Sequence, residues 1–400
     1  MNTDDTRNPE TRWGSGVTVL VFALFGFFGL FWGVFAVLLA DLSGGLGLSP
    51  GPLGVALFAG AAASIVAMAA LGWTADRLGR RVFILISSGV FGLGIAGLAL
   101  AGNYAALLPV LMVLYAASGL YDVGINAAAV DLERAAGRRL MAFFHAAFSA
   151  GGVAGALSAG ALLQAGASYR YVYLAVLAPL GAILLAVTVS RFPASEPPAG
   201  ETSDTIGGRD LRRSVPLLLV AAIATLGLLS EGEMEHWSGV YLRSSLELPA
   251  LLGASGVAVF FGAMAVGRFG AAFVIARFGD RRTLLGAGLA TAGGMTLSLA
   301  TREPFVVVAG FLVVGLALSA VVPIAFSVAG DLAPGRAGAA ISFITTLSYG
   351  GFLLGPVIVG GLAELVGLRL ALGTIAVAGA LIFTLSLRVN TQKKQNFTDV

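Results

Sequence analysis

Residues 17–40 read VTVLVFALFGFFGLFWGVFAVLLA and contain no charged side chain. As a helix rising about 1.5 Å per residue, this stretch is about 36 Å long, enough to cross the ~30 Å hydrocarbon core of a bilayer. Of the 400 residues in the chain, 58% are hydrophobic and only 11% are charged. A soluble domain carries about 25% charged residues, so the composition indicates an integral membrane protein.

Apolar runs of similar length recur along the chain and predict an all-α membrane protein with twelve transmembrane helices. Helices are expected because an open sheet edge cannot be satisfied in lipid and no alternating strand pattern is present. The predicted spans lie near residues 15–40, 51–75, 82–101, 106–130, 139–165, 169–190, 215–242, 250–276, 282–300, 304–331, 337–363 and 368–388.

The distribution of positive charge predicts the orientation. Most of the 24 Lys and Arg residues lie at the two termini and in the loops after even-numbered spans, and Arg268 lies inside a span. Loops rich in Lys and Arg stay in the cytoplasm, so both termini are expected there, in a multi-pass protein of the plasma membrane. The other loops hold only Arg170, Arg243, Arg302 and Arg369.

One long polar segment divides the spans into two sets of six. Residues 191–214 are rich in Pro, Gly, Ser and Thr and are predicted to form a cytoplasmic linker. It separates an amino-terminal six-helix bundle at 15–190 from a carboxy-terminal one at 215–388. Residues 1–14 and 389–400 are predicted to form a cytoplasmic N-terminus and tail.

The two halves share chemistry at an offset of 200 positions, which indicates an internal repeat. Asp131-Leu132 aligns with Asp331-Leu332, and both pairs precede a series of glycines at equal spacing. Two like halves of six spans suggest a transporter whose site lies between two pseudo-symmetric bundles. The glycine series are Gly151, Gly155 and Gly160 in the first half and Gly351, Gly355 and Gly360 in the second.

The loop after the second span, residues 72–81, reads GWTADRLGRR. It resembles the G-x-x-x-D-R-x-G-R-R signature of the major facilitator superfamily, at the place where that family carries it. The resemblance implies the major facilitator fold and a gating role at the cytoplasmic face for Asp76 and Arg77; the alternative is that the arginines only set the orientation. The second half has Ala276 where Asp76 stands. The residues assigned to this gating loop are Gly72, Asp76, Arg77, Gly79, Arg80 and Arg81.

Two further stretches, residues 121–152 and 230–242, resemble a bacterial branch of this superfamily related to the fucose permeases. The resemblance implies transport coupled to protons. In that branch an acidic residue precedes the tryptophan of the second stretch, whereas here His236 holds that position and Glu235 comes one residue earlier.

Asp122 in the fourth span is the first candidate for proton coupling, because acids inside a membrane are usually functional. At 100° per residue, it shares one polar face with Tyr115, Ser118, Asn126 and Glu133. The alternative is a structural acid bonded to a neighbouring helix or to Asn126.

In the fifth span, His145 and Ser149 share a face with small residues and are candidates for the substrate cavity. His145 lies about six residues, ~9 Å, from the cytoplasmic end. It could relay protons or bind a hydroxyl, or it could be a satisfied core histidine.

The seventh span contains four ionisable residues in the sequence SEGEMEH, residues 230–236. Glu231 lies about 16 residues, ~24 Å, from the cytoplasmic end and is the second candidate for proton coupling. It shares a face with Glu235, a cavity candidate, whereas Glu233 and His236 point elsewhere and are expected, with Glu235, to approach a water-filled outer vestibule. Pairing of Glu231 with Arg268 is the structural alternative. Arg268 lies at a different depth, so we expect it to snorkel inward or pair locally.

Aromatic and hydroxyl side chains complete the candidates for the substrate cavity. Trp32 and Trp237 could receive a sugar on an aromatic face, although aromatic stripes more often pack helices together. Thr346 and Tyr349 lie on a face of the eleventh span that also carries Ser342 and Thr345. Such a hydroxyl-lined wall suits a polar solute, and hydrogen bonding between helices would look the same.

The sequence therefore predicts a secondary transporter, not an enzyme, that moves a small sugar- or polyol-like solute by alternating access coupled to protons. Its partners would be the solute, protons and the lipid bilayer, with no ATP, nucleic acid, cofactor or metal, and the protein would be a monomer. The absence of cysteine excludes thiolate chemistry, and no Walker A lysine is present.

Two other functions remain as alternatives. Efflux of drugs or metabolites by proton antiport is the first, and it is disfavoured because residues 155–160, GALSAG, lack the proline that such antiporters carry in the fifth span. A non-transporting receptor on the same scaffold is the second. Its only candidate signalling segments, the linker and the tail, are short.

Overall fold

The computed structural model describes residues 15–137, 140–190, 192, 214–333 and 337–389. Most of the predicted linker and of both predicted termini lies outside these residues. The chain divides into two compact units. The first unit comprises residues 1–202 and 239–261, and the second comprises 203–238 and 262–400.

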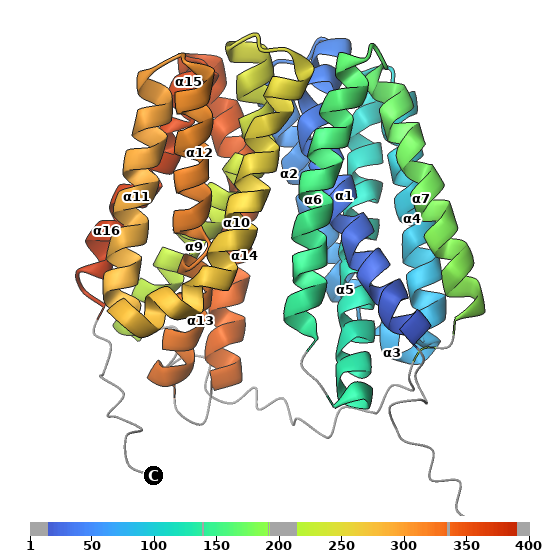
Figure 1. Ribbon diagram of the computed structural model, residues 1–400, viewed down its shortest axis with the longest axis horizontal. Helices are drawn as coiled ribbons and strands as arrows, with labels where there is room; N and C mark the ends of the chain where they lie inside the picture. The colour runs from blue at the N-terminus through green and yellow to red at the C-terminus, as the bar shows by residue number, and fades with distance from the viewer. Residues whose placement is uncertain (1–14, 138–139, 191, 193–213, 334–336, 390–400) are drawn as a thin grey trace, which may run out of the picture. The chain divides into compact units, whose positions relative to one another are not determined.

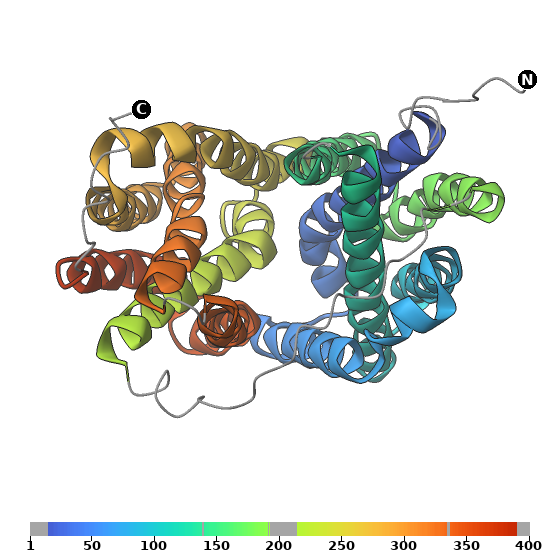
Figure 2. The ribbon, with the colours of Figure 1, turned by 90° about the horizontal axis from the view of Figure 1, so that it is seen from below.

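Twelve helical segments of the described chain are long and apolar enough to cross a membrane, which confirms the predicted number of spans. The first six are α1 (Ser15–Gly45), α2 (Pro50–Leu71), α4 (Arg80–Leu100), α5 (Tyr104–Ala136), α6 (Met141–Gln164) and α7 (Tyr169–Val189), with the short α3 (Thr74–Leu78) before α4. Within the first unit, α1 lies beside α6, and α4 lies beside α5 and α7 (Figures 1 and 2).

The other six spans begin with α9 (Val215–Val240), which continues into the π-helix η2 (Tyr241–Ser245). Then follow α10 (Ala250–Phe278), α11 (Asp280–Ala300), α12 (Pro304–Leu318) with α13 (Val321–Leu332), α14 (Ala337–Val366), and α15 (Leu368–Ala371) with α16 (Gly373–Ser386). Within the second unit, α11 packs against α12 and α16, repeating the pairing of α4 with α5 and α7.

The tenth span is broken between α12 and α13, and the sequence explains the break. A proline removes one backbone N–H and clashes with the carbonyl four residues earlier. Pro323 cannot donate to the Ser319 carbonyl, and the break between α12 and α13 falls at Ser319 and Ala320. The Ser319 hydroxyl donates to the Leu316 carbonyl at 2.7 Å.

The glycine series found in the sequence lies where two helices of each half approach closely. A Cβ added at Gly151 on α6 would collide with the Gly26 carbonyl on α1, and one at Gly351 on α14 would collide with the Thr225 carbonyl on α9. The pairs α1–α6 and α9–α14 thus use equivalent glycines, which explains why the glycines recur at an offset of 200. Small residues allow such close packing of membrane helices.

Candidate functional site

Three charged side chains gather within the spans of the second unit. An Arg268 guanidinium nitrogen on α10 lies 2.8 Å from Glu231 Oε1 on α9, and the Glu231 side chain is only 12% exposed. Glu235, one helical turn after Glu231, has both Glu231 and Arg268 as electrostatic neighbours. We call these three residues the α9–α10 charge cluster.

The expectation that Arg268 snorkels inward or pairs locally is wrong, because it pairs with Glu231 across two helices. The two residues lie at different depths along their helices, but two long, flexible side chains can close a difference of several ångströms. An unpaired charge inside a span is also costly, which favours reaching a distant partner.

The sequence predicted that Glu233 and His236 approach a water-filled outer vestibule. This prediction is wrong, because both residues are buried. The Glu233 side chain is fully buried and the His236 side chain is 5% exposed. The Thr374 hydroxyl lies 3.0 Å from Glu233 Oε2. His236 Nδ1 lies 2.7 Å from the Gly232 carbonyl oxygen, which can only accept, so Nδ1 carries the proton. The two side chains leave α9 on faces that pack against other helices of the second unit.

In the first unit, Asp122 is bonded to its own helix neighbour. Asn126 Nδ2 donates to Asp122 Oδ1 at 2.8 Å, and it also lies 2.9 Å from the Asp122 backbone carbonyl. Both residues are partly exposed. The local bond named as the structural alternative is therefore present. It occupies one carboxyl oxygen and orients the group.

Other members of the polar face of α5 have structural partners. Glu133 Oε2 accepts from the backbone N–H groups of Leu140 and Met141, at 2.6 and 2.9 Å, and so caps the start of α6. The ring centroid of Tyr115 lies 5.0 Å from that of Trp32.

Trp32 belongs to an aromatic cluster, while His145 lies at the protein surface. The indole of Trp32 is half-buried, and the cluster also contains Phe28, Phe31 and Phe35. His145 is exposed, with its ring 5.3 Å from that of Phe25. Ser149 is buried and donates to the His145 backbone carbonyl at 3.2 Å.

The remaining cavity candidates differ in accessibility. Trp237 is fully buried, so in this conformation its ring is covered on all sides. Tyr349 is 46% exposed and Thr346 is also exposed. Thr346 donates to the Ser342 carbonyl at 2.9 Å, which leaves its oxygen able to accept another hydrogen bond.

In the loop that the resemblance assigned to gating, the ion pairs centre on Arg80, and the gating role of Asp76 and Arg77 stays a prediction. Arg80 donates to Asp76 Oδ1 and to Asp131 Oδ2, both at 2.7 Å, and its side chain is 8% exposed. Arg77 instead lies over the Trp73 ring at 4.4 Å. The network ties the start of α4 to the end of α5. Asp131 was visible in the sequence as half of the repeated Asp-Leu pair.

Another ion pair, which was not predicted from the sequence, lies within the first unit. Arg243 on η2 donates to Asp41 Oδ1 on α1 at 2.8 Å and to the Leu248 carbonyl at 3.0 Å. The sequence signals were an acid near the end of one predicted span and an arginine near the end of another, 202 positions apart. Nothing in the sequence linked them.

The sequence profile of the major facilitator superfamily matches residues 20–271 and 254–399. The chain belongs to this superfamily of membrane transporters, and it is not an enzyme. An uncharacterised MFS-type transporter of Yersinia pestis is 31% identical over 331 residues, which are 83% of this chain and 85% of the relative. The membrane protein MosC of Rhizobium meliloti is 28% identical over 375 residues, 93% and 90% of the two chains.

Solved structures show the same fold. The nucleoside transporter NupG superposes with a TM-score of 0.79 at 15% identity, over 95% of this chain and 100% of the other. The D-xylose-proton symporter superposes with a TM-score of 0.72 at 14% identity, over 95% and 98% of the two chains. The narrower resemblance to the fucose permease branch stays a prediction.

Proposed function

We propose that this transporter moves a small hydroxylated solute, sugar- or polyol-like, by alternating access and couples the movement to protons. The observation that carries the proposal is the α9–α10 charge cluster. It places two carboxyl groups and one guanidinium within two neighbouring spans.

The charge balance of the cluster supports proton coupling. One guanidinium neutralises one carboxylate, and Arg268 is paired with Glu231. If Glu235 is ionised as well, the cluster carries one excess negative charge within a span, which is unfavourable. Binding of one proton removes that charge, so Glu235 can load and release a proton as its access to water changes. Asp122 is a second such acid, in the first unit.

The proposed solute class rests on the exposed hydroxyls of α14 and on the nature of the fold. Thr346 and Tyr349 are exposed residues of α14, and the side chain of each ends in a hydroxyl group. The same fold serves a nucleoside transporter and a D-xylose-proton symporter, so it accommodates solutes that carry several hydroxyls. The excess of positive charge in alternate loops supports cytoplasmic termini in a bacterial plasma membrane.

The proposal is tested in two stages. A thermal-shift screen of the purified protein against sugars, polyols and nucleosides identifies a solute, since a ligand stabilises the state that it binds. Uptake of that solute is then measured in proteoliposomes with and without an imposed pH gradient. We expect accumulation only with the gradient, and the direction of the productive gradient separates symport from antiport.

Glu235→Gln should abolish gradient-driven accumulation and leave solute exchange at equal concentrations intact, because the amide cannot carry the proton. Glu303→Gln, at an exposed position just before α12, is the matched control and should accumulate solute normally. Normal accumulation by Glu235→Gln would remove the cluster from the coupling step.

A further inference from the structure

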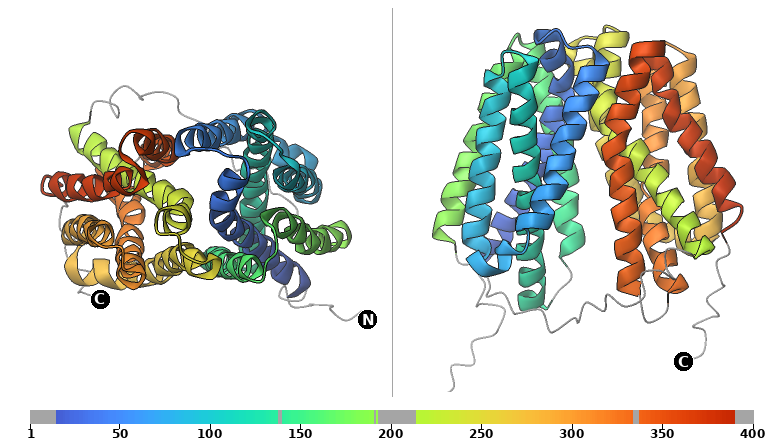
Figure 3. Two further views of the ribbon diagram at one scale, coloured as in Figure 1. Left: turned by 90° about the horizontal axis from the view of Figure 1, so that it is seen from above. Right: turned by 180° about the vertical axis from the view of Figure 1, so that it is seen from behind.

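A cavity of about 470 Å³ within the second unit is lined by residues of α9, α14 and α16. Figure 3 shows α9 passing beside these two helices. Its size is within the range of about 300–1,000 Å³ that is typical of small-molecule sites. Its walls are aliphatic side chains of all three helices, among them Leu226, Leu229, Ile358, Leu362, Val377 and Leu381.

The cavity opens to the outside of the helices. Val377 is 59% exposed and Leu381 is 44% exposed, although both line the cavity. An exposed apolar patch on a membrane-spanning helix suits contact with lipid or with an apolar ligand. The entrance therefore faces the bilayer, and a ligand would arrive from the membrane and not from water.

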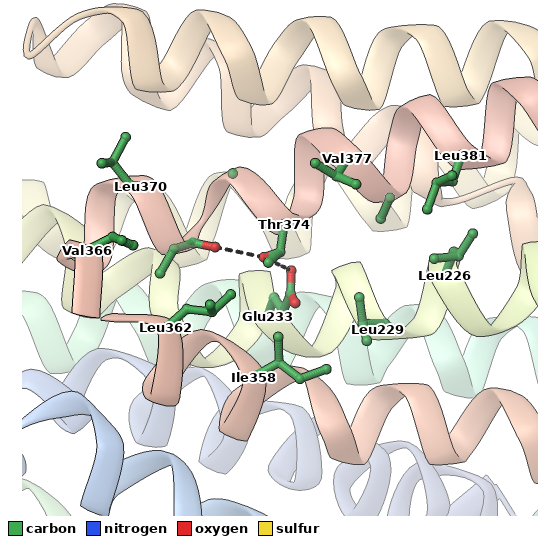
Figure 4. Close-up of a pocket in the computed structure, with 13 residues that line it drawn as sticks. Leu226, Leu229, Glu233, Ile358, Leu362, Val366, Leu370, Thr374, Val377 and Leu381 are labelled. Atoms are coloured by element: carbon green, nitrogen blue, oxygen red, sulfur yellow. Dashed lines mark hydrogen bonds between the residues drawn. The ribbon is translucent and has the colours of Figure 1, made fainter. Parts of the chain in front are cut away.

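One ionisable side chain lies in this apolar cavity (Figure 4). Among the described lining residues it is Glu233, whose side chain is fully buried. Its Oε1 atom has no hydrogen-bond partner in the described part of the chain. Oε2 faces the Thr374 hydroxyl, which also lies 2.8 Å from the Ala371 carbonyl. A hydroxyl has one proton, so Thr374 can donate to only one of these two oxygens.

A buried carboxyl oxygen without a partner is costly, and the cost disappears when a donor is supplied. A cationic donor satisfies the hydrogen bond and also neutralises the carboxylate. We propose that this cavity binds lipophilic amines, molecules with one protonated nitrogen on an apolar body, with the nitrogen at Glu233 Oε1 and the body between α14 and α16.

The depth of Glu233 argues against the amine of a phospholipid headgroup. Glu233 lies twelve residues before Ser245, the last residue of its span, which corresponds to about 18 Å of helix. A phospholipid would have to draw its phosphate to that depth beside a carboxylate. A free amine carries no such anion. The site is separate from the proposed coupling acid, because Glu235 belongs to the α9–α10 charge cluster.

The test uses the full-length protein in phosphatidylcholine nanodiscs and a dodecylamine that carries a photoreactive diazirine in its chain. A diazirine-bearing dodecanol of the same length is the neutral control. Illumination followed by peptide mapping should place the amine on residues 358–381, with much weaker labelling by the alcohol. Equal labelling by the two probes would overturn the proposal and leave a groove for lipid chains.

Three variants sharpen the test. Glu233→Gln should weaken competition by unlabelled dodecylamine roughly tenfold or more, the loss expected for a buried charge-assisted hydrogen bond. Val377→Trp should fill the entrance and abolish labelling even if Glu233→Gln does not fold. Leu93→Trp, at an exposed leucine of α4, is the control and should label like the natural protein.

Two further outcomes decide the chemistry and the independence of the site. Undiminished competition in Glu233→Gln would overturn the role of the carboxyl group. Displacement of the amine in nanodiscs that contain phosphatidylethanolamine would overturn the proposed ligand class, because it would assign the site to a headgroup. Glu235→Gln should keep full labelling, so failure of the proposed coupling mechanism and failure of this site are distinguishable.

Discussion

Charged side chains within the spans have partners that follow from the cost of isolated charge in hydrocarbon. Arg268 meets Glu231 and Arg80 meets both Asp76 and Asp131. Asp122 meets the neutral amide of Asn126, so this partner does not balance its charge. Acids that are paired with a cation hold helices together, whereas an acid without one can change its protonation.

Asp122→Asn should abolish proton-driven accumulation in proteoliposomes while the protein still elutes as a folded species. The amide keeps the size of the side chain and can still accept from Asn126, so the packing of α5 should survive. Asn126→Ala is the companion variant and should alter coupling without abolishing it, because the carboxyl group remains. Unchanged accumulation by Asp122→Asn would show that Asp122 is structural.

Arg268→Ala should destabilise the protein by roughly 1–3 kcal/mol, because it leaves Glu231 largely buried without its cation. The double variant Arg268→Ala/Glu231→Gln should recover much of that loss, since no unpaired charge remains. Thermal unfolding of the purified proteins in the same detergent measures both effects. Equal melting temperatures for the single and double variants would mean that the ion pair contributes little.

At the scale of the elements, close approach of helices depends on single glycines. Gly351 on α14 faces the Thr225 carbonyl, whereas a Cβ added at its neighbour Gly350 would meet open space. The two positions share one helix and one residue type, so they form a matched pair for separating packing from helix propensity.

Gly351→Ala should destabilise the protein by roughly 1–3 kcal/mol, the usual cost of overpacking. Gly350→Ala should be neutral or stabilising by up to about 1 kcal/mol, because alanine favours helix and nothing obstructs its methyl group. Thermal unfolding measures both variants. A loss of stability in Gly350→Ala equal to that in Gly351→Ala would contradict the packing explanation.

The sequence predicts the transmembrane helices better than it predicts which side chains contact one another. Hydrophobic length alone places the spans, and the repeated glycines mark helix pairs, because both signals are local or periodic. The pairing of Glu231 with Arg268 and the burial of Glu233 against Thr374 depend on which helices are neighbours and on how far side chains reach. Neither feature follows from the residue order alone. An estimate from position along the helix therefore misplaced both Arg268 and Glu233.

At the scale of the whole molecule, the boundary between the two units falls inside helices. The first unit takes residues 239–261, which include the end of α9, all of η2 and the start of α10. Phe261 from this segment packs 6.4 Å from Phe148 of α6, and Arg243 pairs with Asp41 of α1. Residues 1–202 alone therefore lack part of their own unit.

A fragment of residues 1–202 should aggregate when expressed alone, because its surface at α1 and α6 loses this covering segment. Co-expression with residues 203–400 should restore a soluble complex in detergent that co-purifies through a tag on either fragment. Size-exclusion chromatography distinguishes the two results. A monodisperse fragment 1–202 would show that the segment 239–261 is dispensable.

The chain passes from one unit to the other next to Gly239 and next to Gly262, and both points lie inside a helix. Ordered backbone hydrogen bonds, and not a flexible loop, therefore connect the two units at these points. Any rearrangement of one body against the other must then bend or twist a helix at these points. The energy barrier of the transport cycle would include that elastic deformation. Stiffening either helix should slow turnover and leave the affinity for the solute almost unchanged.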